Sequence, residues 1–140
     1  MSIFSSTSKV HIAANVATIL FVLTIILQLL LAAGILPISM AWGGRQAELT
    51  TSLRIASLAA VILLGFFIYV IRRRAGLIGD MPIPMITRVF SWIITAFMAF
   101  NTLGNLASLS AGEKILFGPI SFLLAVACLI VSASSLEAAK

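Results

Sequence analysis

Long apolar stretches alternate with short polar ones along the whole of this 140-residue chain. The apolar stretches cover about residues 10–36, 49–71, 86–109 and 115–135. Each is long enough to cross a hydrocarbon core of about 30 Å as an α-helix, which needs roughly 20 residues. An open strand would leave backbone groups unpaired in lipid, so every stretch is expected to be helical. The pattern predicts one all-α membrane domain, an up-down bundle of four transmembrane helices.

The composition supports a membrane environment. Hydrophobic residues make up 61% of the chain and charged residues 9%. A soluble domain of this size exposes much of its chain to water and could not bury that much apolar surface. The first stretch also exceeds the roughly 7–15 apolar residues of a cleavable signal peptide, so we interpret it as a retained span.

Basic residues are divided unevenly between the two sides of the predicted membrane. Four spans place both termini on the same side as the connection between the second and third stretches. Lysine and arginine concentrate in cytoplasmic loops, so the richer side is expected to be the cytoplasm. That side carries six basic residues and the other side three, namely Lys9, Arg72, Arg73, Arg74, Arg88 and Lys140 against Arg45, Arg54 and Lys114. Both termini are therefore predicted to be cytoplasmic.

The Arg72-Arg73-Arg74 run closes the second apolar stretch. We interpret it as a topology determinant and as an anchor for anionic lipid headgroups. Trp42 and Trp92 lie near the ends of spans and are typical of interfacial anchors. The net charge is +5, but the basic residues are too few and too dispersed to form a nucleic-acid-binding groove. The expected partners are membrane lipids, with no nucleic acid.

Few residues in the chain are suited to catalysis or to metal binding. Cys128 is the only cysteine, which excludes an intramolecular disulfide and a dithiol redox pair. His11 is the only histidine, so one chain cannot build a two-histidine haem or metal site. No carboxylate pair or nucleophile triad can be assembled within the spans. The sequence predicts a protein that is not an enzyme, without catalytic residues, metal or cofactor.

Small residues recur at helical spacing on three of the four stretches. In lipid, helices associate through close packing of such residues and through interhelical hydrogen bonds. The faces comprise Gly118, Ser121, Ala125, Cys128, Ser132 and Ser135 in the fourth stretch, Ser52, Ala56 and Ala60 in the second, and Ser91, Thr95, Ala99 and Thr102 in the third. They are expected to form contacts within the bundle, or contacts with a second copy or a partner membrane protein. Thr24 and Gln28, one turn apart, are expected to find partners on a neighbouring helix, and the alternative is that they belong to a transport site.

A polar cluster on the predicted outer side is the candidate ligand-binding site. Its members are Arg45, Arg54, Asn101, Asn105 and Glu113. In one interpretation they form a structural cap, in which arginines reach headgroups or pair with a glutamate and asparagines tie helices together. In the other they line a shallow pocket for an anionic or amphiphilic ligand such as a lipid headgroup.

Two local features give this cluster its expected geometry. The Gly43-Gly44 pair permits positive φ angles and close approach, so Arg45 is expected on a tight turn or a re-entrant kink. Arg54 lies near the start of a span, where the helix dipole disfavours a cation. A carboxylate partner, either Glu48 or Glu113, would offset that effect.

Three strings along the chain resemble those of small uncharacterised bacterial four-span membrane proteins. They are Ala41-Trp42-Gly43-Gly44-Arg45, Asn101-Thr102-Leu103-Gly104-Asn105, and Gly112-Glu113-Lys114 with Phe117-Gly118-Pro119. The resemblance implies a bacterial cytoplasmic membrane and brings no activity with it. Two functions are therefore expected from the sequence. The first is a structural, accessory or partner-binding role, and the alternative is a small transporter, channel, or lipid- or anionic-ligand-binding protein that uses the outer cluster.

Overall fold

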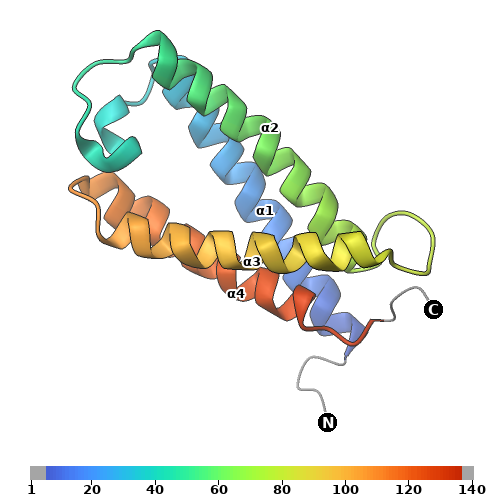
Figure 1. Ribbon diagram of the computed structural model, residues 1–140. Helices are drawn as coiled ribbons and strands as arrows, with labels where there is room; N and C mark the ends of the chain where they lie inside the picture. The colour runs from blue at the N-terminus through green and yellow to red at the C-terminus, as the bar shows by residue number, and fades with distance from the viewer. Residues whose placement is uncertain (1–5, 137–140) are drawn as a thin grey trace.

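A computed structural model describes residues 6–136 of the chain, which form two antiparallel helical hairpins (Figure 1). Each of the four long helical segments is long and apolar enough to cross a membrane, which confirms the predicted all-helical, four-span architecture. The elements are α1 (Thr7–Ala32), the 3-10 turns η1 (Ile38–Met40) and η2 (Trp42–Gly44), α2 (Thr51–Arg74), α3 (Met85–Leu106), the π-helical turn η3 (Glu113–Phe117) and α4 (Gly118–Ser132).

The first two helices differ from the predicted spans at their ends. α1 stops at Ala32, earlier than predicted, because Gly34 adopts a φ of 77° and turns the chain out of the helix. α2 begins after Thr50, whose side-chain oxygen accepts a hydrogen bond from the Leu53 N–H at 3.2 Å. It then continues through Arg74, since basic residues are favourable at the negative end of the helix dipole.

The fourth span begins as a π-helical turn. Pro119 has no backbone N–H, and its ring would clash with the Ile115 carbonyl in a regular α-helix. The wider turn of η3 precedes this proline and gives way to α4 at Gly118. The span therefore starts at Glu113, two residues before its predicted start.

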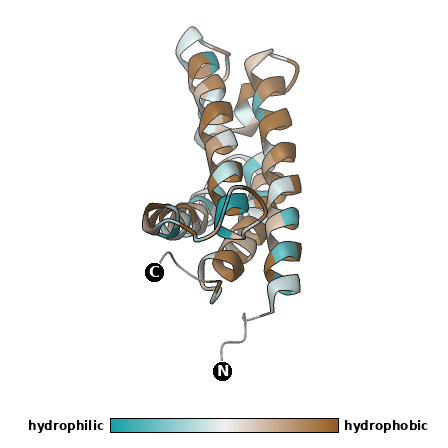
Figure 2. Cartoon of the chain, turned by 90° about the vertical axis from the view of Figure 1, so that its right-hand side faces the viewer, coloured by the Kyte–Doolittle hydropathy of each residue, from teal (hydrophilic) through white to brown (hydrophobic). Residues whose placement is uncertain are grey.

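The two hairpins, α1–α2 and α3–α4, form a V (Figure 1). They converge at the arginine end, where Arg72, Arg73 and Arg74 lead into the 75–84 connection. They spread apart at the cap end, which holds the 33–50 and 107–112 connections. Apolar residues also cover the outward faces of the helices, as expected for surfaces in contact with lipid (Figure 2).

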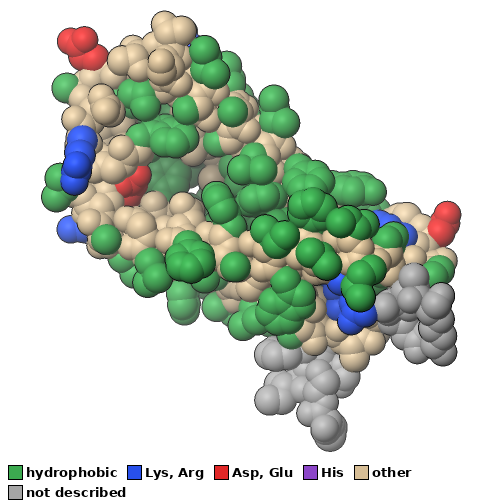
Figure 3. Space-filling model, in the orientation of Figure 1, with side chains coloured by type: hydrophobic (Ala, Val, Ile, Leu, Met, Phe, Trp, Pro, Cys, Tyr) green, Lys and Arg blue, Asp and Glu red, His purple; other side chains and the backbone are tan. Residues whose placement is uncertain are grey.

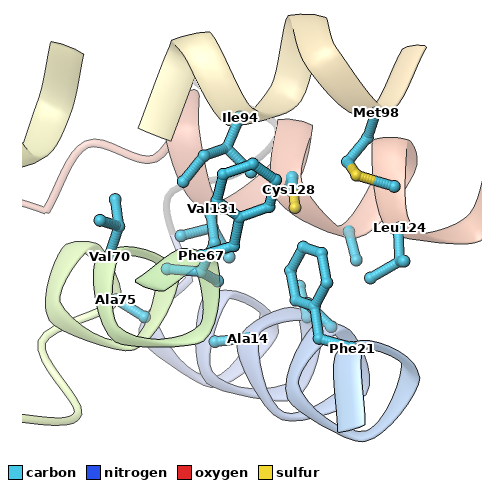
Figure 4. Close-up of a cluster of buried hydrophobic side chains, with 14 of the residues drawn as sticks. Ala14, Phe21, Phe67, Val70, Ala75, Ile94, Met98, Leu124, Cys128 and Val131 are labelled. Atoms are coloured by element: carbon cyan, nitrogen blue, oxygen red, sulfur yellow. The ribbon is translucent and has the colours of Figure 1, made fainter. Parts of the chain in front are cut away.

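The main core lies where the hairpins converge, and all four helices contribute to it (Figure 4). The Phe67 ring of α2 packs edge-on against Phe21 of α1 and Phe97 of α3, with centroid distances of 5.8 Å and 5.4 Å. Such aromatic pairs prefer this geometry because the ring edge is positive and the face negative. A smaller apolar cluster of Leu31, Ile38, Ala41 and Phe117 forms near the cap end.

Polar pairs hold α3 against α4. The hydroxyls of Thr95 and Ser132 are 3.0 Å apart, and the Asn105 amide donates to Ser121 Oγ at 3.1 Å. Interhelical hydrogen bonds of this kind favour helix association in lipid. Cys128 lies between these two pairs on α4 and is fully buried. The small-residue face of α4 is therefore largely an internal contact.

The small-residue faces of α3 and α2 are each only partly buried. On α3, Ser91, Thr95 and Thr102 are buried, whereas Ala99 is exposed. On α2, Ser52 is exposed and Ala56 and Ala60 are half-buried, so this series is not a closely packed helix contact. Ser57 is the fully buried small residue of α2 instead.

Candidate functional site

The 33–50 connection folds over the cap end and bridges the two hairpins. The Gly43 N–H donates to Glu113 Oε1 at 3.0 Å. Gly44 approaches the backbone of Ser110 so closely that a Cβ there would lie 2.7 Å from the Ser110 nitrogen. Trp42, Gly43 and Gly44 all have positive φ, as the tight turn expected from the glycine pair requires. The glycines thus allow the backbone of one hairpin to reach the other.

Glu113 occupies the last position of a Ser-x-x-Glu string that begins at Ser110. In a capping box the serine hydroxyl accepts from the glutamate N–H while the glutamate side chain returns to the serine N–H. Here the first bond forms, at 3.3 Å, but the Ser110 N–H bonds to Ser108 Oγ at 3.0 Å instead. This leaves the Glu113 carboxylate to accept from Gly43 and from the Ser108 hydroxyl. The carboxylate is therefore directed toward the other hairpin, although it is only 8% exposed.

A cavity of about 210 Å³ lies between the hairpins, below the cap. Figure 3 shows the molecule hollowed on this face, between the α1–α2 and α3–α4 hairpins. The helices α1, α2 and α3 and the turns η2 and η3 contribute to its lining, which consists of Thr24, Gln28, Ala41, Trp42, Ala60, Leu63, Leu64, Phe97, Met98, Asn101, Asn105, Glu113 and Phe117. The cavity thus combines a mostly apolar wall with several polar groups, as ligand-binding sites commonly do.

Several hydrogen-bond donors of the lining are already used within the protein. The Trp42 indole N–H donates to Ser57 Oγ at 3.3 Å, and the Asn105 amide donates to Ser121. The Thr24 hydroxyl donates to a carbonyl of its own helix at 2.8 Å, and not to a neighbouring helix as expected. Gln28 Oε1 is buried and finds no hydrogen-bond partner among the described residues. A buried acceptor without a partner is uncommon and calls for an explanation.

The structure brings together only part of the predicted outer cluster. Asn101, Asn105 and Glu113 line the cavity together with Trp42, which the sequence analysis assigned to anchoring. Arg45 and Arg54 are exposed and do not line it. Because the Glu113 carboxylate bonds to Gly43 and Ser108, it is not the partner of Arg54.

Two members of the arginine run bond to nearby parts of the chain. Arg72 donates to Asn15 Oδ1 at 3.1 Å and to Thr18 Oγ1 at 3.3 Å, which links α2 to α1. Arg73 donates to backbone carbonyls of the 75–84 connection. Contact of these residues and of Trp92, which is 48% exposed on α3, with lipid headgroups stays a prediction.

Arg74 is buried at the end of α4. Its guanidinium donates to the carbonyls of Ser134 at 2.7 Å, Ser132 at 3.3 Å and Leu136 at 3.5 Å. Ser132 is the last residue of α4 and the other two residues follow it, so these carbonyls have no partners within the helix. Arg74 therefore caps α4 and joins it to the end of α2. Because its side chain is fully buried, it does not also contact lipid headgroups.

Sequence reasoning missed three serines that shape the site, namely Ser57, Ser108 and Ser110. The Ser-x-x-Glu string was the available signal for the last of them, because it marks a helix start. Gln28 and Thr24 stand out in the sequence as polar residues within a span, which predicts either contacts between helices or a transport site.

Metal and thiol chemistry find no assembled site in the described chain. Within residues 6–136, no three histidine, cysteine, aspartate or glutamate side chains lie together as metal ligands do. Cys128 is buried in the α4 contact face, and His11 is half-buried on α1. In comparisons with protein-family models, curated proteins and solved structures, this chain matched none.

Proposed function

We propose that this multi-pass membrane protein binds a small amphiphilic molecule in the cavity between its hairpins. The observation that carries the proposal is the cavity lining, in which polar groups face apolar side chains. Glu113, Asn105 and Asn101 contribute the polar part, and Leu63 and Phe97 contribute to the apolar wall. Polar groups at membrane depth are unfavourable unless they are hydrogen-bonded, so they commonly mark sites of function.

The shape of the molecule supports entry of the ligand from the bilayer. The hollow lies between the hairpins, and its mouth is at the side of the V (Figure 3). A side opening faces lipid when the helices cross the membrane. A molecule with an apolar chain could enter there and place its headgroup beneath the cap, near Glu113.

The alternative is a structural or accessory role. It would need a surface other than the small-residue face of α4. Ser121, Cys128 and Ser132 of α4 are buried within the chain itself. Partner binding through this face therefore loses its basis. Binding of a partner or a second copy through another helix face remains the competing proposal, without catalysis in either case.

Filling the cavity is expected to reduce labelling by a membrane-soluble amphiphile. The probe is a neutral long-chain alcohol that carries a diazirine beside its hydroxyl group, added to the protein in phosphatidylcholine nanodiscs. Ala60→Phe places a ring in the cavity, so cross-linking to the lining residues should fall at least severalfold by peptide mass spectrometry. Ala59→Phe is the matched control, because Ala59 is exposed and does not line the cavity.

The wild-type labelling pattern decides between the two roles. Ligand binding predicts that cross-links concentrate on Leu63, Met98 and other lining residues. Labels spread evenly over the lipid-facing sides, with the two phenylalanine variants alike, would refute the cavity as a binding site and favour the accessory role.

We further propose that the membrane is the bacterial cytoplasmic membrane and that both termini are cytoplasmic. The excess of basic residues at the arginine end supports this orientation, because lysine and arginine are retained in the cytoplasm. Lys9, Arg88 and the arginine run belong to that end, whereas Lys140 lies outside the described residues.

Cysteine labelling is expected to reveal this orientation in intact cells. Ala47 and Asp80 are exposed in the two connections on opposite sides, and native Cys128 is fully buried. A membrane-impermeant maleimide should label Ala47→Cys from outside, and Asp80→Cys only after the membrane is opened. The reverse pattern would invert the orientation, and equal labelling of both variants would indicate dual topology.

A further inference from the structure

The ionisable groups of the cavity indicate the charge of its ligand. Glu113 is the only charged residue in the lining, and Arg45 and Arg54 lie outside it. An anionic headgroup placed there would meet a carboxylate that is 92% buried and no cation. Like charges in such a poorly solvated site repel strongly, since the effective dielectric constant is low. The lining therefore disfavours the anionic ligands considered from the sequence.

The hydrogen-bonding groups lead to the same ligand class. The indole of Trp42, one amide N–H of Asn105 and the hydroxyl of Thr24 donate to other protein atoms, whereas the exposed Asn101 amide has no acceptor among the described residues. Gln28 Oε1 has no partner among the described residues, but protein atoms enclose it and it has no surface open to the cavity. The Glu113 oxygens accept one bond each, although a carboxylate has about four acceptor positions. A ligand that donates hydrogen bonds would use this surplus.

The aromatic side chains of the lining and the size of the cavity further limit the kind of ligand that it could bind. Phe97, Phe117 and the exposed part of the Trp42 ring line the cavity, and aromatic faces attract cations. The cavity of about 210 Å³ is smaller than the roughly 300–1,000 Å³ typical of sites for drug-sized ligands. It suits a compact headgroup with the first part of one chain, and the rest of the chain would extend into lipid.

We infer that the cavity binds a single-chain amphiphile with a protonated amine headgroup. This inference rests on the proposed function and specifies its ligand. The ammonium group lies against the Glu113 carboxylate, and its hydrogens donate to the acceptor positions that Gly43 and Ser108 leave open. The alkyl chain follows the apolar wall formed by Leu63 and Leu64 toward the side opening.

Three probes with the same ten-carbon chain test the inference, namely decylammonium, decanol and decyl sulfate. The readout is Trp42 emission in the full-length protein carrying Trp92→Phe, in phosphatidylcholine nanodiscs, because Trp42 lines the cavity. Decylammonium is expected to bind most tightly and decyl sulfate least tightly. Glu113→Gln should weaken decylammonium binding about ten- to a hundredfold, as expected for loss of a charge-assisted hydrogen bond.

Controls separate a change in charge from a change in fold. Glu48→Gln removes an exposed carboxylate outside the cavity and should leave all three affinities unchanged. Decanol should bind Glu113→Gln and wild type similarly, which checks that the cavity is intact. If Glu113→Gln does not fold, the order of the three affinities in the wild-type protein tests the inference by itself, because the probes differ only in the headgroup.

The outcomes distinguish the inference from the proposed function. Decanol or decyl sulfate binding as tightly as decylammonium, or unchanged decylammonium affinity in Glu113→Gln, would overturn the inference and leave amphiphile binding in place. A Trp42 signal that responds to none of the three probes would overturn the proposed function as well.

Discussion

Arg74→Met is expected to destabilise the protein by about 2–4 kcal/mol, because hydrogen bonds from a charged donor contribute roughly 1.5–3 kcal/mol each and the bonds here are partly redundant. Arg74 is fully buried and donates to three backbone carbonyls at the end of α4. Methionine preserves much of the apolar stem but leaves those carbonyls without a donor. Unfolding of the purified protein by sodium dodecyl sulfate in mixed micelles, followed by circular dichroism, measures the change.

Arg72→Met is the matched control for Arg74→Met. It removes the same charge from the same run, so any effect of net charge is equal in the two variants. Arg72 bonds to side chains on α1 and is not fully buried, so its loss should cost less than about 1 kcal/mol. Equal destabilisation by the two substitutions would show that Arg74 acts through its charge alone, and not as a cap for α4.

Gly44→Ala is expected to destabilise the cap end by about 2–4 kcal/mol, combining left-handed backbone strain with a steric overlap. Gly44 has a φ of 71°, and an added Cβ would lie 2.7 Å from the Ser110 backbone nitrogen. Backbone cannot move aside as a flexible side chain can, so the two hairpins must separate there. The same unfolding measurement reports the loss, and Trp42 emission should change because the cap carries it.

Gly43→Ala separates the two contributions at the neighbouring position. Gly43 has a φ of 84°, but a Cβ there would have no neighbour within 4 Å. Only the strain of a left-handed backbone remains, and it costs roughly 1–2 kcal/mol. If both alanine variants lose the same stability, the close approach of Gly44 to Ser110 does not hold the hairpins together.

The helices were predictable because lipid restricts the options of the backbone. A chain that cannot hydrogen-bond to water must satisfy its own N–H and carbonyl groups, so apolar length alone indicates a helix. The helix ends were less predictable. Residues 33–36 are as apolar as the span before them, yet the left-handed Gly34 ends α1 ahead of the predicted boundary.

The candidate site was only partly predictable for a related reason. Asn101 and Asn105 are four residues apart on one helix, so their shared face follows from helical geometry. The directions of Arg45 and Glu113 depend on the 33–50 connection, which has no helical repeat and includes residues with positive φ. Spacing cannot give such directions. The sequence predicts that Glu113 lies at the cap end of the molecule. It does not indicate that the Glu113 carboxylate points toward Gly43.

The hydrogen bonds between α3 and α4 have a consequence for how the chain enters the membrane. α3 has a mean hydropathy of only 1.3, compared with 2.5 for the span that contains α4. Part of that polarity comes from Thr95 and Asn105, the residues that bond to Ser132 and Ser121. Alone in lipid, α3 would carry these groups without interhelical partners, and its insertion would be less favourable. We therefore expect the second hairpin to insert as a unit, with α4 stabilising the less apolar α3.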